Sequence, residues 1–428
     1  MINRRTFLGA LGSGLAATSF GWADSPKPKR LAIVSTVWHY GSHAWHMGER
    51  FLVGYPINGK WHHPPLKVVS AYVDQMPDND LSRSRARDFG FQIYPTVAET
   101  LRCGGDQLAV DAVLVIGEHG NYPANELGQT LYPRYEFFKE IVEVFESDGR
   151  AVPMFNDKHL SWNWSWAKQM VETSRAMGFA YMAGSSLPVT WRMPSIDLPY
   201  GAEVEEVMCV AYGSAESYGI HALETIQCMA ERRRGGESGV RWMEALSGEA
   251  LWAAMNASSW QDGGWDPKLL HACLCRSQTL AQPKTYGHRL PTTPQMQEWV
   301  EDPVALRFEY QDGLKATMLI MNKLVRDFTF AARLRGQSGA GSGDRSEFLS
   351  TLFYLPAMPN VVYSAALMSK VEQMFLTGKA PYPIDRTLLT TGLAAAAAEA
   401  RAKEGRRIET PHLAVRYHAP EESNFWRM

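Results

Sequence analysis

The chain has 428 residues, enough for two domains, and its 45% hydrophobic and 21% charged residues are ordinary for a globular protein. A formal net charge of −2 gives no reason to expect nucleic acid or an acidic membrane surface as a partner. The five cysteines form no CxxC pair, which argues against a disulfide framework or a zinc knuckle. The 14 Trp and 17 Tyr residues favour a carbohydrate ligand, because such rings stack on the apolar faces of sugars, although packing is the commoner role of each ring.

Residues 1–25 have the composition of an export signal. The pair Arg4-Arg5, followed by Thr6, precedes an apolar run rich in Gly and Ala that ends near Ala23. This pattern is typical of a twin-arginine signal peptide, which exports proteins that are already folded. No later run reaches the roughly 18 apolar residues that a membrane span needs. The sequence therefore predicts a periplasmic or otherwise extracytoplasmic protein without a membrane span.

Residues 30–192 alternate short β-branched runs with helical ones, as in a parallel sheet with crossover helices. The expected strands are residues 31–36, 67–74, 91–94, 112–116, 151–156 and 180–183. The expected helices are residues 43–52, 82–89, 96–102, 134–146 and 164–177, and residues 55–65 are expected to form an inserted loop. This α/β region is predicted to be a Rossmann-like domain with a doubly wound parallel sheet.

Residues 193–428 show a different periodicity and are predicted to form an α+β domain with a mostly antiparallel sheet, for substrate binding or oligomerisation. The expected strands are residues 203–211, a hairpin over 306–322 that turns at Asp312-Gly313, and residues 328–335 and 412–417. The expected helices are residues 218–233, 361–376 and 386–403, with a Gly/Ser-rich loop at 336–343. An exposed antiparallel sheet would make a homo-oligomer unsurprising.

Histidines and carboxylates follow three of the predicted parallel strands, at the edge where the carboxyl ends of a doubly wound sheet converge on one crevice. They are His39, His43, Glu118, His119, Asp157 and His159. This set of N and O donors suits a divalent metal such as Zn, Mn or Fe. It also suits polar substrate contacts, an acid/base set without a metal, or ordinary hydrogen bonding in loops.

Several segments resemble the Gfo/Idh/MocA oxidoreductases. Residues 84–101 and 110–113 look like the second half of that family's nucleotide domain, and Asp157-Lys158-His159 lies where the family has Glu-Lys-Pro. The later Gly219-x-His221 resembles the family's Gly-x-His helix start. The similarity covers most of residues 30–230.

The resemblance implies an NAD(P)-dependent enzyme. It would make Lys158 a catalytic lysine beside the nicotinamide, with Asp157 next to it and His221 as a general acid or base. It would place Asp74, at the end of the second strand, on a ribose hydroxyl of the dinucleotide. The other cofactor-binding residues that it implies are Thr36, Trp38, Gly41 and Gly117.

The departures from the family pattern fall at the cofactor. The glycines of the first turn are replaced by Ser35 and Val37, and a β-branched residue there would obstruct the pyrophosphate. The Thr-Pro after the fourth strand is replaced by residues 117–120, Gly-Glu-His-Gly, and Ser217 stands where an aspartate is usual before Gly-x-His.

Three functions from different classes follow. The first is an exported enzyme that acts on a sugar or polyol by hydride transfer with a nicotinamide cofactor, either as a net oxidation or transiently within a net non-redox cleavage. The second is a metal-dependent lyase or hydrolase of carbohydrate that uses the histidine crevice and no NAD. The third is a non-catalytic carbohydrate-binding relative.

Overall fold

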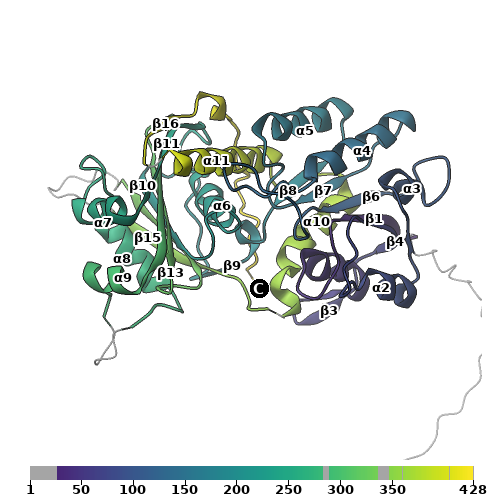
Figure 1. The fold of residues 1–428 in the computed structure, drawn as a ribbon, viewed down its shortest axis with the longest axis horizontal. Helices are drawn as coiled ribbons and strands as arrows, with labels where there is room; N and C mark the ends of the chain where they lie inside the picture. Colours follow the sequence, from purple (N-terminus) through teal and green to yellow (C-terminus); the bar gives the residue numbers. More distant parts are fainter. Residues whose placement is uncertain (1–26, 283–288, 336–346, 359, 404, 428) are drawn as a thin grey trace, which may run out of the picture.

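The computed structural model describes residues 27–427, except residues 283–288, 336–346, 359 and 404, and contains two large sheets side by side (Figure 1). The strands of the first sheet are β1 (Lys29–Ser35), β4 (Leu66–Val73), β5 (Gln92–Ile93), β6 (Ala112–Ile116), β7 (Met154–Asp157) and β8 (Tyr181–Gly184). All their pairings are parallel, in the order β5-β4-β1-β6-β7-β8. This is the doubly wound order of dinucleotide-binding folds, so the predicted Rossmann-like sheet is confirmed.

Helices cover both faces of this sheet. The residues of β1 alternate between them: Leu31 and Ile33 face one side, Ala32 and Val34 the other, and all are fully buried. Ala32 and Val34 share a core with α3 (Val97–Arg102), α4 (Arg134–Ser147) and α5 (Trp164–Met177). The opposite face is covered by the π-helical turn η1 (Ala44–Gly48), α1 (Glu49–Val53) and α10 (Ala365–Thr377). Helix α10 therefore packs on the first sheet, although it lies far along the chain. A further helix, α2 (Ser82–Phe89), follows β4.

Residues 55–65 are not an irregular loop as predicted. They form a hairpin of β2 (Tyr55–Ile57) and β3 (Lys60–His62). The reason is the Asn58-Gly59 pair, whose positive φ angles of 52° and 69° give a tight turn that matches the strand twist.

The second sheet runs in the order β16-β11-β12-β13-β10-β14-β15-β9, and only β10 and β13 are parallel. Its strands are β9 (Trp191–Met193), β10 (Val204–Ala211), β11 (Val240–Ser247), β12 (Glu301–Tyr310), β13 (Lys315–Asn322), β14 (Phe328–Leu334), β15 (Glu347–Tyr354) and β16 (Ile408–Glu409). The mostly antiparallel sheet and the hairpin at Asp312-Gly313 are confirmed. The strand predicted at 412–417 is wrong, since η4 (Pro411–Leu413) begins there, and the loop predicted at 336–343 lies outside the described residues.

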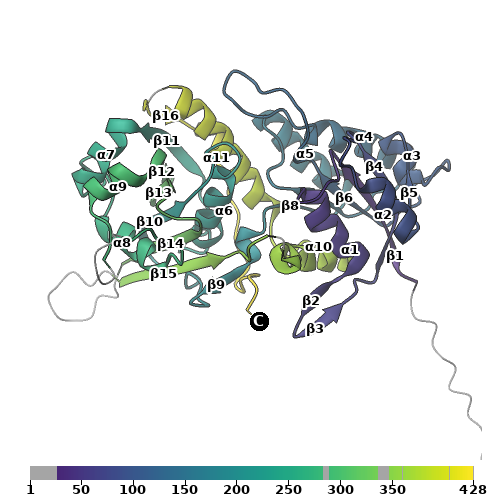
Figure 2. The same ribbon diagram turned by 60° about the horizontal axis from the view of Figure 1, so that its bottom comes forward.

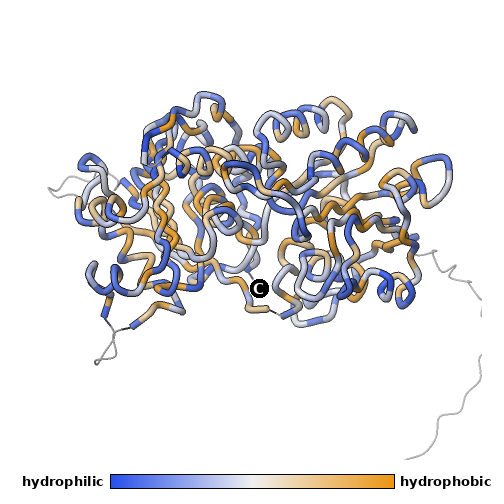
Figure 3. The backbone as a smooth tube through the Cα atoms, viewed as in Figure 1, coloured by the Kyte–Doolittle hydropathy of each residue, from blue (hydrophilic) through white to orange (hydrophobic). Residues whose placement is uncertain are grey.

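Helices also cover both faces of the second sheet. On the face toward the first sheet lie α6 (Gly219–Ala230) and α11 (Ile384–Ala402), and α11 crosses from one sheet to the other (Figure 2). The far face is covered by α7 (Gly248–Ala257), α8 (Pro267–Arg276) and α9 (Thr293–Trp299). Two short 3-10 turns, η2 (Leu187–Val189) and η3 (Val361–Tyr363), complete the elements. Hydrophobic residues concentrate in the strands of both sheets (Figure 3). Among the described residues, no helix is long and apolar enough to cross a membrane.

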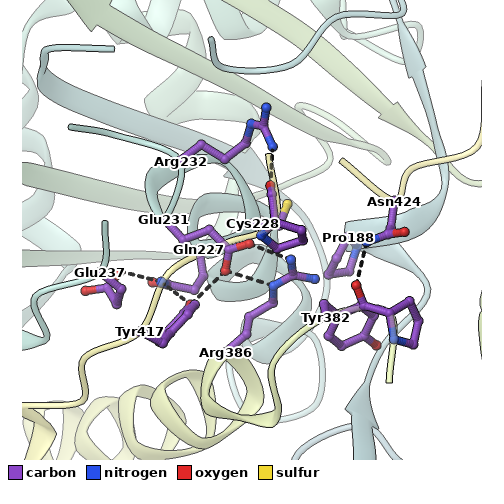
Figure 4. Close-up of polar contacts among 12 residues, drawn as sticks. Pro188, Gln227, Cys228, Glu231, Arg232, Glu237, Tyr382, Arg386, Tyr417 and Asn424 are labelled. Atoms are coloured by element: carbon purple, nitrogen blue, oxygen red, sulfur yellow. Dashed lines mark hydrogen bonds and ion pairs between the residues drawn. The ribbon is translucent and has the colours of Figure 1, made fainter. Parts of the chain in front are cut away.

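A buried polar network fixes α11 to α6 (Figure 4). The Arg386 guanidinium donates to both oxygens of Glu231, which also accepts from the hydroxyl of Tyr417 at 2.7 Å. Gln227 donates to the same hydroxyl and to Glu237. Arg386 and Glu231 are 5% and 1% exposed, so each charge depends on the other for solvation.

We predict that Arg386→Met destabilises the protein by about 3–5 kcal/mol, because Glu231 is left buried without its cation. Lys403→Met, at the end of the same helix, removes an exposed pair with Glu399 and should change little. Urea unfolding of the two variants measures the difference. Equal unfolding free energies for both would contradict this account of the network.

Candidate functional site

A cavity of about 380 Å³ lies where the carboxyl ends of β6 and β7 meet the second sheet. Its size is within the range of about 300–1,000 Å³ for small-molecule sites. Its lining is His43, Glu118, His119, Tyr132, Lys158, Leu187, Tyr212, Glu216, Ser217, Tyr218, His221, Phe328, Leu355 and Tyr363. A larger hollow of about 710 Å³, between residues 126–128, β11 and the end of α11, is lined mostly by small and apolar residues and holds no such group of titratable side chains. The smaller cavity is therefore the candidate site.

Glu118 is the central charge of the site. Its carboxylate accepts from Lys158 Nζ at 2.7 Å and from the Arg134 guanidinium, and all three side chains are buried. Although burial would raise the pKa of Glu118, Lys158 and Arg134 hold it well below its usual value. The preceding Gly117 makes room for this pairing, because a Cβ there would lie 2.6 Å from Cγ of Arg134. Gly117 therefore admits the arginine, and its contact with a cofactor stays a prediction.

His43 and Asp157 form an imidazole–carboxylate pair. His43 Nδ1 lies 2.6 Å from Oδ2 of Asp157, whose side chain is fully buried and whose Oδ1 has no hydrogen-bond partner. A carboxylate on Nδ1 favours the tautomer that leaves Nε2 free to accept a proton. Since His43 also lines the cavity, the pair has the arrangement of a general base.

Further imidazoles gather around this pair. The His119 ring lies 4.9 Å from that of His43 and 6.1 Å from that of His39. Burial, reinforced by His43, lowers the pKa of His119 to about 4 and that of His46 to about 4. Burial, and then Arg134, hold the pKa of His159 well below its ordinary value, and its Nε2 lies 3.3 Å from Nη1 of Arg134.

His221 lies in the first turn of α6 and lines the cavity opposite the first sheet. Burial and then Lys158 hold its pKa well below the ordinary value, so the ring is neutral near pH 7. Its Nδ1 is buried without a partner, which leaves a polar atom for a ligand to satisfy. Its neighbours are aromatic, with ring centroids of Tyr218 and Phe328 at 5.7 and 6.1 Å.

Two residues of the lining have a strained backbone. Lys158 has φ = 57° and His119 has φ = 69°, in the left-handed region that non-glycine residues rarely adopt. The Lys158 conformation is held by a hydrogen bond from its N–H to the carbonyl of Gly184, at 3.3 Å. Strain of this kind concentrates at functional sites.

The metal-site prediction is not supported and is corrected here. No group of three or more His, Cys, Asp or Glu side chains in the described part of the chain is arranged to hold a metal ion. The donors are engaged with other partners: Glu118 with two cations, His43 with Asp157, and His159 with Arg134. His39 hydrogen-bonds in its own turn, to the Tyr40 carbonyl. A cation beside Lys158 and Arg134 would also be repelled.

The other predicted cofactor residues have different surroundings. The Trp38 ring is fully buried and stacks on Phe91, so its side chain belongs to the core and does not face the crevice. Thr36 is buried, and its hydroxyl donates to the Glu118 carbonyl at 2.7 Å. Gly41 lies in the turn after β1 and has φ = 77°, a backbone conformation that glycine adopts easily and other residues rarely do.

Asp74 is exposed at the carboxyl end of β4, the position expected for a residue that binds a ribose. Its two oxygens accept hydrogen bonds from two hydroxyls, Tyr72 at 2.8 Å and Tyr122 at 2.6 Å. Two O–H donors on one carboxylate are also what a ribose diol supplies. The chemistry of Asp74 therefore fits the predicted cofactor role, and Tyr122 stands at the same carboxylate.

Sequence reasoning missed several residues of the cavity. Arg134 lies at the start of a predicted helix, and no motif in the sequence indicates that it is the second cation that pairs with Glu118. Tyr212, Tyr363 and Leu355 come from the second sheet and from the approach to α10, so only the tertiary fold brings them to the site. Tyr132 precedes α4 in a segment without a sequence signature.

These features define a class: a doubly wound parallel domain joined to a mostly antiparallel sheet, with a polar cavity between them. No family model and no curated protein matches the sequence. Solved structures do match, including GenD2 from gentamicin A biosynthesis in complex with NAD, with a TM-score of 0.51 and 13% identity over 94% of this chain and 99% of that one. Scyllo-inositol dehydrogenase from Lactobacillus casei has a TM-score of 0.51 and 10% identity over 90% and 98% of the two chains. An NAD-binding oxidoreductase from Klebsiella pneumoniae has a TM-score of 0.51 and 12% identity, over 90% of this chain and 99% of that one. The resemblance to the Gfo/Idh/MocA oxidoreductases is confirmed in the fold.

We predict that the protein loses stability as the pH falls from 6.5 to 4. His46 and His119 have pKa values lowered to about 4, so in this window the unfolded chain binds more protons than the folded one. Each contributes a slope of up to about 1.4 kcal/mol per pH unit. Below pH 4.5 Glu118 adds to the effect, because the unfolded chain binds a proton there while Lys158 and Arg134 hold the pKa of the folded carboxyl well below this value.

The measurement is the unfolding free energy against pH. His119→Gln should flatten the slope between pH 4 and 6.5, while His63→Gln, at an exposed position outside the cluster, should leave it unchanged. A slope that is the same in the wild type and in His119→Gln would show that this histidine is not buried as described.

Proposed function

We propose that the protein is an oxidoreductase of the Gfo/Idh/MocA type that acts on a sugar or polyol with a nicotinamide cofactor. The observation that carries the proposal is the convergence of Lys158, His221 and the His43–Asp157 pair on one cavity at the carboxyl edge of the doubly wound sheet. The fold shared with NAD-binding dehydrogenases supports it, as does the hydroxyl-binding pattern at Asp74.

In this proposal the residues of the cavity handle the substrate's proton. His43 Nε2 accepts the proton of the reacting hydroxyl, and the Asp157 carboxylate stabilises the imidazolium that forms. Lys158, fixed by Glu118, donates a hydrogen bond to the same oxygen and orients it. The neutral His221 accepts from a neighbouring hydroxyl through its unpartnered Nδ1.

When bound, a nicotinamide cofactor would supply the hydride acceptor for the carbon that bears this hydroxyl. Asp74 would hold its adenosine ribose, and Lys158 would lie beside the nicotinamide. Tyr132, Tyr212, Tyr218 and Tyr363 line the cavity and suit the apolar faces and hydroxyls of a sugar ring.

We predict that the purified protein binds NAD(H) and reduces NAD with a panel of inositols and aldoses. His43→Gln should lower kcat by about 10²–10⁴-fold while NAD binding is retained, because the general base is lost and the nucleotide contacts are not. NADH fluorescence measures binding and absorbance at 340 nm measures turnover. Binding of sugars without NAD binding or turnover, unchanged in Lys158→Ala, would instead favour the non-catalytic carbohydrate-binding relative.

We further propose that the protein is exported through its twin-arginine segment, with the cofactor bound before export. Replacing Arg4 and Arg5 with lysine should keep the protein in the cytoplasm, because the paired arginines are the recognised feature. Fractionation of cells that express the two forms checks this. Equal periplasmic amounts of the two forms would refute the route.

Self-association into a homo-oligomer stays a prediction that size-exclusion chromatography with light scattering can test.

A further inference from the structure

The loop of residues 117–123 crosses the carboxyl edge of the first sheet. It leaves β6 and reaches Asp74, which follows β4, and β1 lies between these two strands. The loop therefore passes over the end of β1, where the turn that receives a dinucleotide's pyrophosphate begins in this fold.

Three hydrogen bonds fasten the loop there. The Tyr122 hydroxyl donates to Oδ2 of Asp74 at 2.6 Å. Gln75 and Asn121 exchange two more: the Asn121 N–H donates to Oε1 of Gln75 at 2.9 Å, and Gln75 Nε2 donates to the Asn121 carbonyl at 3.2 Å. Gly120, with φ = 103°, lets the Tyr122 ring fold back, since a Cβ there would lie 2.7 Å from the ring.

We propose that Tyr122 is a latch that competes with the ribose of a dinucleotide for Asp74. The inference rests on the proposed function, because it takes the dinucleotide to be the ligand of this edge. Both oxygens of Asp74 already accept a phenol hydroxyl, so a ribose diol competes with these phenols for the lone pairs of the carboxylate. Tyr122 is the phenol that can be displaced, because it is on the loop while Tyr72 is on β4 itself.

The latch is joined to the candidate site. The same loop carries Glu118 and His119, which line the cavity. The turn between the two ends of the loop is short and includes the positive φ angles of His119 and Gly120. Release of Tyr122 by a bound ribose therefore acts on the loop that positions Lys158 through Glu118.

The experiment is titration of NAD and of ADP-ribose into the wild type, Tyr122→Phe and Tyr135→Phe, by calorimetry. Tyr122→Phe keeps the ring, including its edge contact with Tyr132, and removes only the competing hydroxyl. We expect it to bind both ligands about tenfold more tightly, because a hydrogen bond to a charged group no longer has to be broken. Tyr135→Phe removes a hydroxyl that donates to Gln169, away from Asp74, and should bind as the wild type does.

The outcomes separate the latch from the proposed function. Measurable binding that is equal or weaker in Tyr122→Phe overturns the latch and leaves the cofactor proposal standing. If neither protein binds NAD or ADP-ribose while circular dichroism shows both folded, the latch and the nicotinamide proposal are overturned together. Nicotinamide mononucleotide, which lacks the adenosine ribose, should show no gain in Tyr122→Phe, and an equal gain would also overturn the assignment to Asp74.

Discussion

The site depends on one buried interaction, the carboxylate of Glu118 between Lys158 and Arg134. Removing three charges from water costs several kcal/mol each, and only mutual pairing at hydrogen-bond distance offsets this. The pairing in turn requires Gly117, whose missing Cβ admits Arg134, and a left-handed backbone at Lys158 that the Gly184 carbonyl holds. The conformation of the loop after β6 and the end of β7 therefore follows from keeping this carboxylate paired.

This constraint also explains why no metal-binding group is found among the described residues of the histidine-rich crevice. A metal ion would compete for Glu118 with Lys158 and Arg134, and breaking these pairs would leave their buried charges without a partner. It would also compete for His43 with the buried carboxylate of Asp157. The same pairs are favourable for proton transfer. Asp157 sets the tautomer of His43, and low pKa values keep His119 and His221 neutral, so the imidazoles accept hydrogen bonds where charged ones would repel Lys158.

The sequence predicted the parallel sheet and the edge at which the polar residues meet, because strand order and carboxyl ends follow from local patterns and the chain's own periodicity. It did not predict which side chains pair. Arg134 lies 16 residues from Glu118 in the chain, and its role depends on a contact that no spacing rule describes. Tyr363 reaches the cavity only because the neighbouring α10 returns to cover the first sheet. Buried apolar residues of α10, such as Leu367 and Phe375, pack in the core of that sheet and hold the helix there. The family resemblance implied a cofactor contact for Trp38, but a large ring gains more from stacking on Phe91 in the core than from exposure.

The first turn after β1 has Ser35 and Val37 where the family it resembles has glycines, and both side chains are buried. The neighbouring loop carries a carboxylate that pairs with Lys158 at one end and a phenol that pairs with Asp74 at the other. Asp74, where the proposed nucleotide would bind, and the candidate substrate cavity are thereby linked by residues 117–122. This segment of six residues is short enough to move as a unit. In the proposed mechanism, a ligand that binds Asp74 in place of Tyr122 moves the loop that holds Lys158 through Glu118. Binding at Asp74 and the position of Lys158 are then coupled in one equilibrium.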